Sequence, residues 1–183
     1  MKRFIPMVLS LSMVQAHAGE EAPVKLAEVP EPVMQAIQER FETIELTGAN
    51  TETEIDGYMV YEVQGNIPAG EFLDGEHEPL VDENGDVVFE QTTPAETSRQ
   101  VEFDLTPDGK FDEIEIEFLQ DMVPGAVLQA VKRAHPEFEA RFIEASYSST
   151  MDVIGYEFSG LNQDQPMDLE VSPSGRHIQL ADD

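Results

Sequence analysis

Three oxygen-bearing side chains at alternate positions, Asp82, Asn84 and Asp86, have the spacing most suggestive of a metal site. Alternate oxygen ligands of this kind begin a calcium-binding loop. Such a loop places glycine sixth and a bidentate glutamate twelfth, whereas here Gly85 is fourth and Thr93 is twelfth. The segment is therefore a candidate calcium site, but a plain hairpin turn is the favoured interpretation.

A second acidic pattern is the run Glu113, Glu115 and Glu117, which alternates with apolar residues. A period of two is typical of a strand with one face on a core and the other in water. We expect this acidic strand face, together with residues 67–100, to be the surface that binds a partner.

Other chemistry finds little support in the residue pattern. The histidines beyond the N-terminal segment, at 77, 135 and 177, show no metal-ligand spacing, and Gly-x-Ser-x-Gly and phosphate-loop motifs are absent. There is no cysteine, which excludes disulfides and thiol chemistry. Pairs of carboxylates are so numerous that no particular pair can be singled out as a catalytic acid and base. The sequence predicts a protein that is not an enzyme and needs no cofactor beyond the calcium considered above.

The chain is strongly acidic, with 38 Asp and Glu against 10 Lys and Arg and a formal net charge of -28. Nucleic acid and anionic membrane surfaces would repel such a protein. The charge suits recruitment of a basic partner or of cations, or it forms a solvated surface for salty surroundings. Because the acids are spread along the chain, the second interpretation is favoured.

The N-terminus has the order of a secretion signal. Lys2 and Arg3 precede an apolar run over residues 4–14, and Ala16-His17-Ala18 supplies a small-residue cleavage site. The apolar run is shorter than the roughly twenty residues of a membrane-spanning helix. We predict a signal peptide over 1–18, a short tail over 19–25, a periplasmic or secreted location and no membrane insertion after cleavage.

The rest of the chain contains an internal repeat. Residues 29–37 (VPEPVMQAI) return as 123–131 (VPGAVLQAV), 61–65 (YEVQG) as 156–160 (YEFSG), and 103–110 (FDLTPDGK) as 169–176 (LEVSPSGR). The offset falls from 95 to 66 residues between the last two pairs, so the first copy holds an insertion of about thirty residues at about 67–100. Asn84-Gly85 within it predicts a tight hairpin.

Each copy reads as one helix followed by strands. Pro30 and Pro124 suit the first turn of a helix, and His135-Pro136 should end the second one. Period-two segments near 59–63, 101–105 and 114–118 recur near 154–158, 167–171 and 178–180, with turns at 106–109 and 172–175. The predicted class is α+β: two tandem repeats, each one helix packed on a small antiparallel sheet.

The chain resembles the PepSY and PepSY-like domains of exported bacterial proteins. The resemblance rests on a helix beginning near Val-Pro, a Tyr-Glu-Val strand and a strand ending in Asp-Gly-Lys or Ser-Gly-Arg, all behind a signal peptide. The two copies would cover 26–118 and 119–183, with the insertion departing from the compact family unit. The resemblance implies a non-catalytic binding or regulatory module, with protease inhibition among the family's proposed roles and an envelope protein or protease as partner. The alternative is an acidic, calcium-responsive periplasmic protein.

Overall fold

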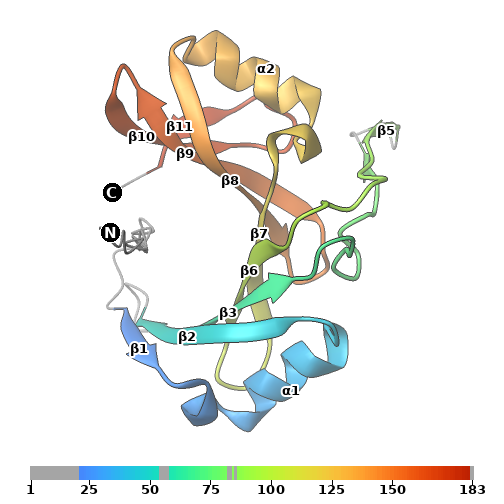
Figure 1. The fold of residues 1–183 in the computed structure, drawn as a ribbon, viewed down its shortest axis with the longest axis vertical. Helices are drawn as coiled ribbons and strands as arrows, with labels where there is room; N and C mark the ends of the chain where they lie inside the picture. The colour runs from blue at the N-terminus through green and yellow to red at the C-terminus, as the bar shows by residue number, and fades with distance from the viewer. Residues whose placement is uncertain (1–20, 54–57, 82–83, 85, 182–183) are drawn as a thin grey trace, which may run out of the picture.

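The computed structural model describes residues 21–53, 58–81, 84 and 86–181 (Figure 1). The predicted signal peptide, residues 1–18, and Asp82 of the predicted calcium loop lie outside the described residues. Within the described ranges, no helix has both the length and the apolar character needed to cross a bilayer. Part of the predicted tail, Ala22–Val24, forms the first strand.

In each half of the chain a short 3-10 helix and an α-helix are followed by four strands of the large sheet, and the first half also contains β1, β4 and β5. The elements are β1 (Ala22–Val24), η1 (Leu26–Glu28), α1 (Glu31–Arg40), β2 (Glu45–Thr53), β3 (Met59–Ile67), β4 (Leu80–Val81), β5 (Val87–Phe89), β6 (Arg99–Leu105), β7 (Phe111–Glu117), η2 (Gln120–Met122), α2 (Gly125–Ala134), β8 (Phe138–Ser148), β9 (Val153–Asn162), β10 (Gln165–Val171) and β11 (Ile178–Leu180).

Nine strands form one continuous antiparallel sheet in the order β1-β2-β3-β6-β7-β8-β9-β10-β11, and β4 and β5 form a separate hairpin. The two halves join where β7 pairs with β8, with Ile114 opposite Tyr147 and Ile116 opposite Ala145. The α+β class is confirmed. The expectation of a small, separate sheet under each helix is corrected, because the outer edge of β7 has backbone groups that pair with β8.

The prolines predicted at the helix starts stand one position earlier than expected. Pro30 and Pro124 are the N-cap residues directly before α1 and α2. The second helix ends at Ala134, and His135 precedes Pro136 outside it, as predicted.

One side of each helix is buried against the sheet. Val33 and Ile37 of α1, and Val127 and Val131 of α2, are each at most 7% exposed. Burying an aliphatic side chain of this size stabilises the fold by about 1.5–3 kcal/mol. Figure 1 shows the two helices at opposite ends of a strongly bent sheet, with the hairpin of β4 and β5 on the same side of the molecule as the helices.

A single row of core residues runs across both halves of the sheet. Val63 lies opposite Phe103, Phe103 opposite Ile114, and Ile114 opposite Tyr147. All four belong to one hydrophobic cluster that also contains buried residues of both helices. Because side chains alternate along a strand, the residues between these positions point to the other face.

The predicted insertion is the segment between β3 and β6, and a buried ion pair holds it to the sheet. Arg99 Nη1 lies 2.7 Å from Glu76 Oε1, and the two side chains are 1% and 0% exposed. The backbone N–H of Leu73 donates a 2.9 Å hydrogen bond to Glu76 Oε2. Leu73 and Ala95 are buried beside them. β4 pairs with β5 as the two strands of the predicted hairpin should, but Gly85 of the predicted tight turn lies outside the described residues.

Candidate functional site

The face of the sheet opposite the helices carries carboxylates on neighbouring strands. Glu62 of β3 lies opposite Asp104 of β6, and Asp104 lies opposite Glu113 of β7. One step along, Glu102 of β6 lies opposite Glu115 of β7. These five residues, which we call the central acidic cluster, occupy the positions between core-facing residues.

A second row of carboxylates crosses the later strands of the same face. Glu117 of β7 lies opposite Glu144 of β8, Glu144 opposite Glu157 of β9, and Glu157 opposite Glu170 of β10. Like charges directly opposite one another destabilise a sheet. This repeated arrangement of ionised carboxylates therefore lowers the stability of the folded state.

Three members of the central acidic cluster meet the geometric requirement of a metal site. One carboxylate oxygen from each of Glu62, Glu102 and Asp104 lies within 4.8 Å of the others. Gln64 Nε2 donates a 2.8 Å hydrogen bond to Glu102 Oε2, and the Asn50 side chain hydrogen-bonds Glu62. The amides orient two of the three carboxylates, as outer partners do in metal sites.

Asp104 differs from its neighbours in having an unsatisfied oxygen. Its Oδ1 is shielded from solvent and accepts no hydrogen bond from the residues that the structure describes. Buried carboxylate oxygens are normally paired, because an unpaired one has lost its hydration without compensation. This oxygen therefore marks the point of the face that most requires a positive ligand.

Burial and mutual repulsion make these groups hard to ionise. Burial, followed by repulsion from Glu102, raises the pKa of Glu62 to about 7. Burial and then repulsion from Glu102 and Glu62 raise the pKa of Asp104 well above its usual range. In the second row, burial and then Glu157 raise the pKa of Glu144 to about 8. The neighbouring charges that shift these pKa values are all carboxylates, so the face favours uptake of protons or cations.

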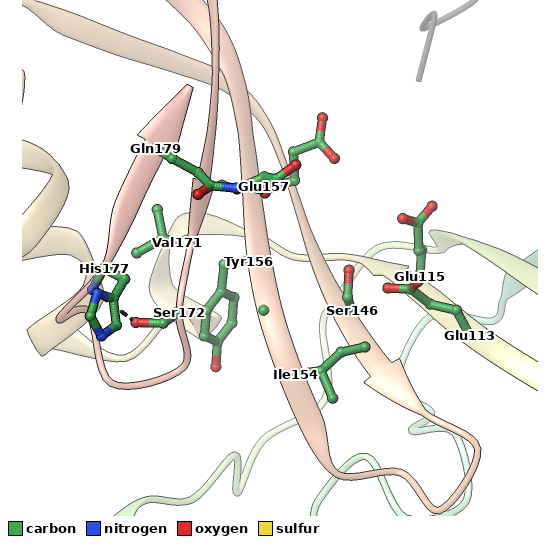
Figure 2. Close-up of a pocket in the computed structure, with 12 residues that line it drawn as sticks. Glu113, Glu115, Ser146, Ile154, Tyr156, Glu157, Val171, Ser172, His177 and Gln179 are labelled. Atoms are coloured by element: carbon green, nitrogen blue, oxygen red, sulfur yellow. Dashed lines mark hydrogen bonds between the residues drawn. The ribbon is translucent and has the colours of Figure 1, made fainter. Parts of the chain in front are cut away.

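A hollow of about 450 Å³ adjoins the central acidic cluster on the side of β9 to β11. Figure 2 shows Glu113 and Glu115 at one side of it and Glu157 near Gln179 at the other. The Tyr156 ring points away from Glu157, into the core where it lies 6.0 Å from the ring of Phe118. The hollow is therefore bordered by carboxylates on two sides.

The residues predicted from sequence fall in two places. Glu113, Glu115 and Glu117 lie on one face as expected, but each is partly buried rather than fully exposed, because β7 is the central strand of the sheet. Asn84 and Asp86 are exposed and lie in the chain between β4 and β5. The calcium loop at that hairpin stays a prediction.

Sequence reasoning missed Glu62, Glu102 and Asp104. A signal was present, since the Tyr-Glu-Val and Phe-Asp-Leu blocks each place one acid between two apolar residues, and both blocks return in the second half. What the sequence does not contain is the register that brings the acids of different blocks together. Only the pairing of β3 with β6 shows that Glu62 faces Asp104.

No protein-family model and no curated protein matches the chain. A solved structure of a candidate periplasmic protein from Bacteroides eggerthii is similar to it, with a TM-score of 0.50 and 13% identity over 83% of this chain and 88% of that one. A candidate calcium-regulated periplasmic protein from Bacteroides thetaiotaomicron aligns with 17% identity over 87% and 96% of the two chains, at a TM-score of 0.28. The first similarity concerns the fold alone, and the second is too weak to support an argument.

Proposed function

We propose that this chain is an exported, non-catalytic protein that responds to divalent cations through the acidic face of its sheet. The observation that carries the proposal is the buried, unpaired Oδ1 of Asp104 among carboxylates that only repel it. A divalent cation placed there would neutralise the repulsion and supply the missing partner. Hard, oxygen-preferring cations such as calcium bind carboxylates in this way.

The periplasm is the proposed location. The predicted signal peptide over 1–18 supports it, and the fold is similar to that of the candidate periplasmic protein from Bacteroides eggerthii. Calcium is available at high concentration outside the cytoplasm, and extracellular modules bind it with dissociation constants of about 10⁻⁴–10⁻³ M. A site with three side-chain carboxylates suits that range.

We propose also that the two halves of the chain descend from one PepSY-like unit. Irregularities in pairing occur at equivalent places, between Leu46 and Gly48 in β2 and between Ala140 and Phe142 in β8, 94 residues apart. A second match is a close contact between a turn and a helix. In the first half, the turn at Gly109 lies so near α1 that a Cβ on Gly109 would be 2.5 Å from the Pro32 carbonyl oxygen. These matches go beyond the sequence blocks that suggested the resemblance.

The equivalent contact of the second half has the same form. A Cβ on Gly175 would lie 3.0 Å from the carbonyl oxygen of Ala126, and Ala126 stands in α2 where Pro32 stands in α1. In each half, the turn between the last two strands therefore lies close to the first turn of the α-helix of that half. A shared local contact of this kind is what a duplicated unit would retain.

Binding of a basic envelope protein or a protease is the second candidate function. The hollow beside Glu113 and Glu115 favours it, because a basic side chain could enter a depression bordered by carboxylates. Pull-down from an envelope extract at several salt concentrations would test this candidate. Recovery of the same protein, weakening as salt rises, supports it, and recovery of nothing counts against it.

Thermal melting tests the cation response. The protein is melted in EDTA, in millimolar CaCl₂, and in NaCl of matched ionic strength. With a dissociation constant of about 10⁻⁴–10⁻³ M, CaCl₂ at about 10 mM is present at about 10–100 times that constant and stabilises the fold by about 1.4–2.7 kcal/mol. Each kcal/mol raises the Tm of a chain of this size by about 2–4 °C. We expect a rise of several degrees in CaCl₂ and a much smaller one in NaCl. Equal rises in both would contradict the proposal.

A further inference from the structure

We propose that Glu62, Glu102 and Asp104 together bind one calcium ion. This inference rests on the cation response proposed above and specifies where the ion lies. The calcium position expected from sequence was the hairpin around Asn84 and Asp86, so the two assignments predict different variants to lose the response.

The three ligands come from two paired strands. Glu102 and Asp104 are two residues apart on β6 and therefore point to the same face, and Glu62 lies across from Asp104 on β3. Their oxygens lie within 4.8 Å of one another. Two ligands on opposite sides of a calcium ion are about 4.6–5.2 Å apart, since each calcium–oxygen distance is about 2.3–2.6 Å. One ion can therefore contact all three without movement of the strands.

The charge and hydrogen bonding of the site select a cation. Asp104 Oδ1 is buried without a donor, and the charged groups that act on Asp104 are Glu102, Glu62, Glu113 and Glu52. An anion would be repelled by all of them, and a neutral donor would leave their mutual repulsion in place. A divalent ion satisfies the oxygen and offsets the charge together.

Calcium fits this ligand set better than magnesium. The carboxylates are fixed on strands and, in Glu62 and Glu102, by hydrogen bonds from Asn50 and Gln64. Calcium accepts irregular arrangements of six to eight oxygens, with water completing the shell, whereas magnesium requires near-octahedral geometry at about 2.0–2.1 Å. We expect magnesium to bind more weakly than calcium.

The second half of the chain contains a matched control. Glu157 lies opposite Glu170 as Glu62 lies opposite Asp104. Glu170, however, is exposed, and its Oε2 accepts a 2.6 Å hydrogen bond from Gln179. Among the described residues, no group of three carboxylates close enough for one ion is found in this half. Glu170→Gln removes the same charge from an equivalent position outside the proposed site.

The experiment is calorimetric titration of the purified full-length protein with CaCl₂, and in parallel with MgCl₂. We expect one calcium ion to bind per chain at this site, with affinity reduced about tenfold or more in Asp104→Asn and Glu102→Gln. Glu170→Gln should change the affinity by less than about twofold. Each apo variant is first melted to establish that it is folded, and if Asp104→Asn does not fold, Glu102→Gln decides the result.

The possible failures separate the two proposals. No calcium binding by the unaltered protein would overturn the cation-responsive function and this site together. Calcium binding that persists unchanged in Asp104→Asn and Glu102→Gln would overturn this site and leave the function standing. Loss of binding in Asp86→Asn, with both site variants unaffected, would place the ion at the hairpin instead.

Discussion

Glu62 and Asp104 lie directly opposite each other on β3 and β6, at positions that alternate with core-facing residues and therefore belong to the other face of the sheet. Repulsion between opposed carboxylates is the common property of this face, since Glu144 and Glu157 stand in the same relationship on β8 and β9. The stability of the protein should therefore depend on how many of these groups are ionised. The raised pKa values of these groups indicate the direction in which stability changes with pH.

We predict that the metal-free protein becomes less stable as the pH rises from about 5 to about 9. Folding raises the pKa of Glu62 to about 7 and that of Glu144 to about 8, from the usual glutamate value of 4.5. Above 4.5 the folded state thus holds more protons than the unfolded state, so stability falls with rising pH until both groups have ionised. Urea denaturation in EDTA across this pH range measures the trend. Stability that rises over the range would contradict it.

Glu144→Gln should stabilise the protein at pH 9 by roughly 1 kcal/mol or more, because it removes a partly buried charge that repels Glu157. The gain should vanish near pH 5, where Glu144 is protonated in the folded state. Glu42→Gln, at an exposed position in the loop after α1, is the matched control and should change stability little at either pH. An equal gain at pH 5 and pH 9 would show that charge is not the cause.

Glu76→Gln should destabilise the protein by about 3–5 kcal/mol, because Arg99 would remain buried without its partner. The insertion should also be cleaved sooner by protease, since the ion pair joins it to β6. Glu28→Gln breaks the exposed pair with Lys25 and should cost less than about 1 kcal/mol. Urea denaturation and limited proteolysis measure both variants, and similar losses in the two would refute the anchoring role.

Gly109→Ala should cost more stability than Gly70→Ala. Both glycines have positive φ, 82° and 81°, so alanine incurs about 1–2 kcal/mol of backbone strain at either position. At Gly109 the new Cβ would also lie 2.5 Å from the Pro32 carbonyl oxygen, whereas nothing lies within 4 Å at Gly70. The additional clash should add roughly 1–3 kcal/mol. Equal losses in urea denaturation would mean that the turn does not pack against α1 as described.

The local elements could be predicted from the sequence because their signals are local. Proline and apolar spacing indicated the helices, and Asn84 with Gly85 indicated the hairpin. The first strand after each helix, β2 or β8, was missed. For β2 the reason is that Glu45–Thr53 has few apolar residues and that its pairing with β3 is not visible from composition. Propensity is a weak guide to strands whose stability comes from their neighbours.

The site was less predictable than the fold, because it depends on register between segments far apart in the chain. The sequence predicted that Glu113, Glu115 and Glu117 share a face, which a period of two is sufficient to show. It did not predict that Glu62 would face Asp104, 42 residues later, across the insertion. It also did not predict the pairing of β7 with β8, which extends the acidic face into the second half.

The most direct test of the central claim is a crystal structure determined in millimolar CaCl₂, with anomalous scattering used to locate calcium. We predict one ion between β3 and β6, with oxygens of Glu62, Glu102 and Asp104 at about 2.3–2.6 Å. An ion at the hairpin beside Asn84 and Asp86 instead, or no calcium on the acidic face, would contradict the claim.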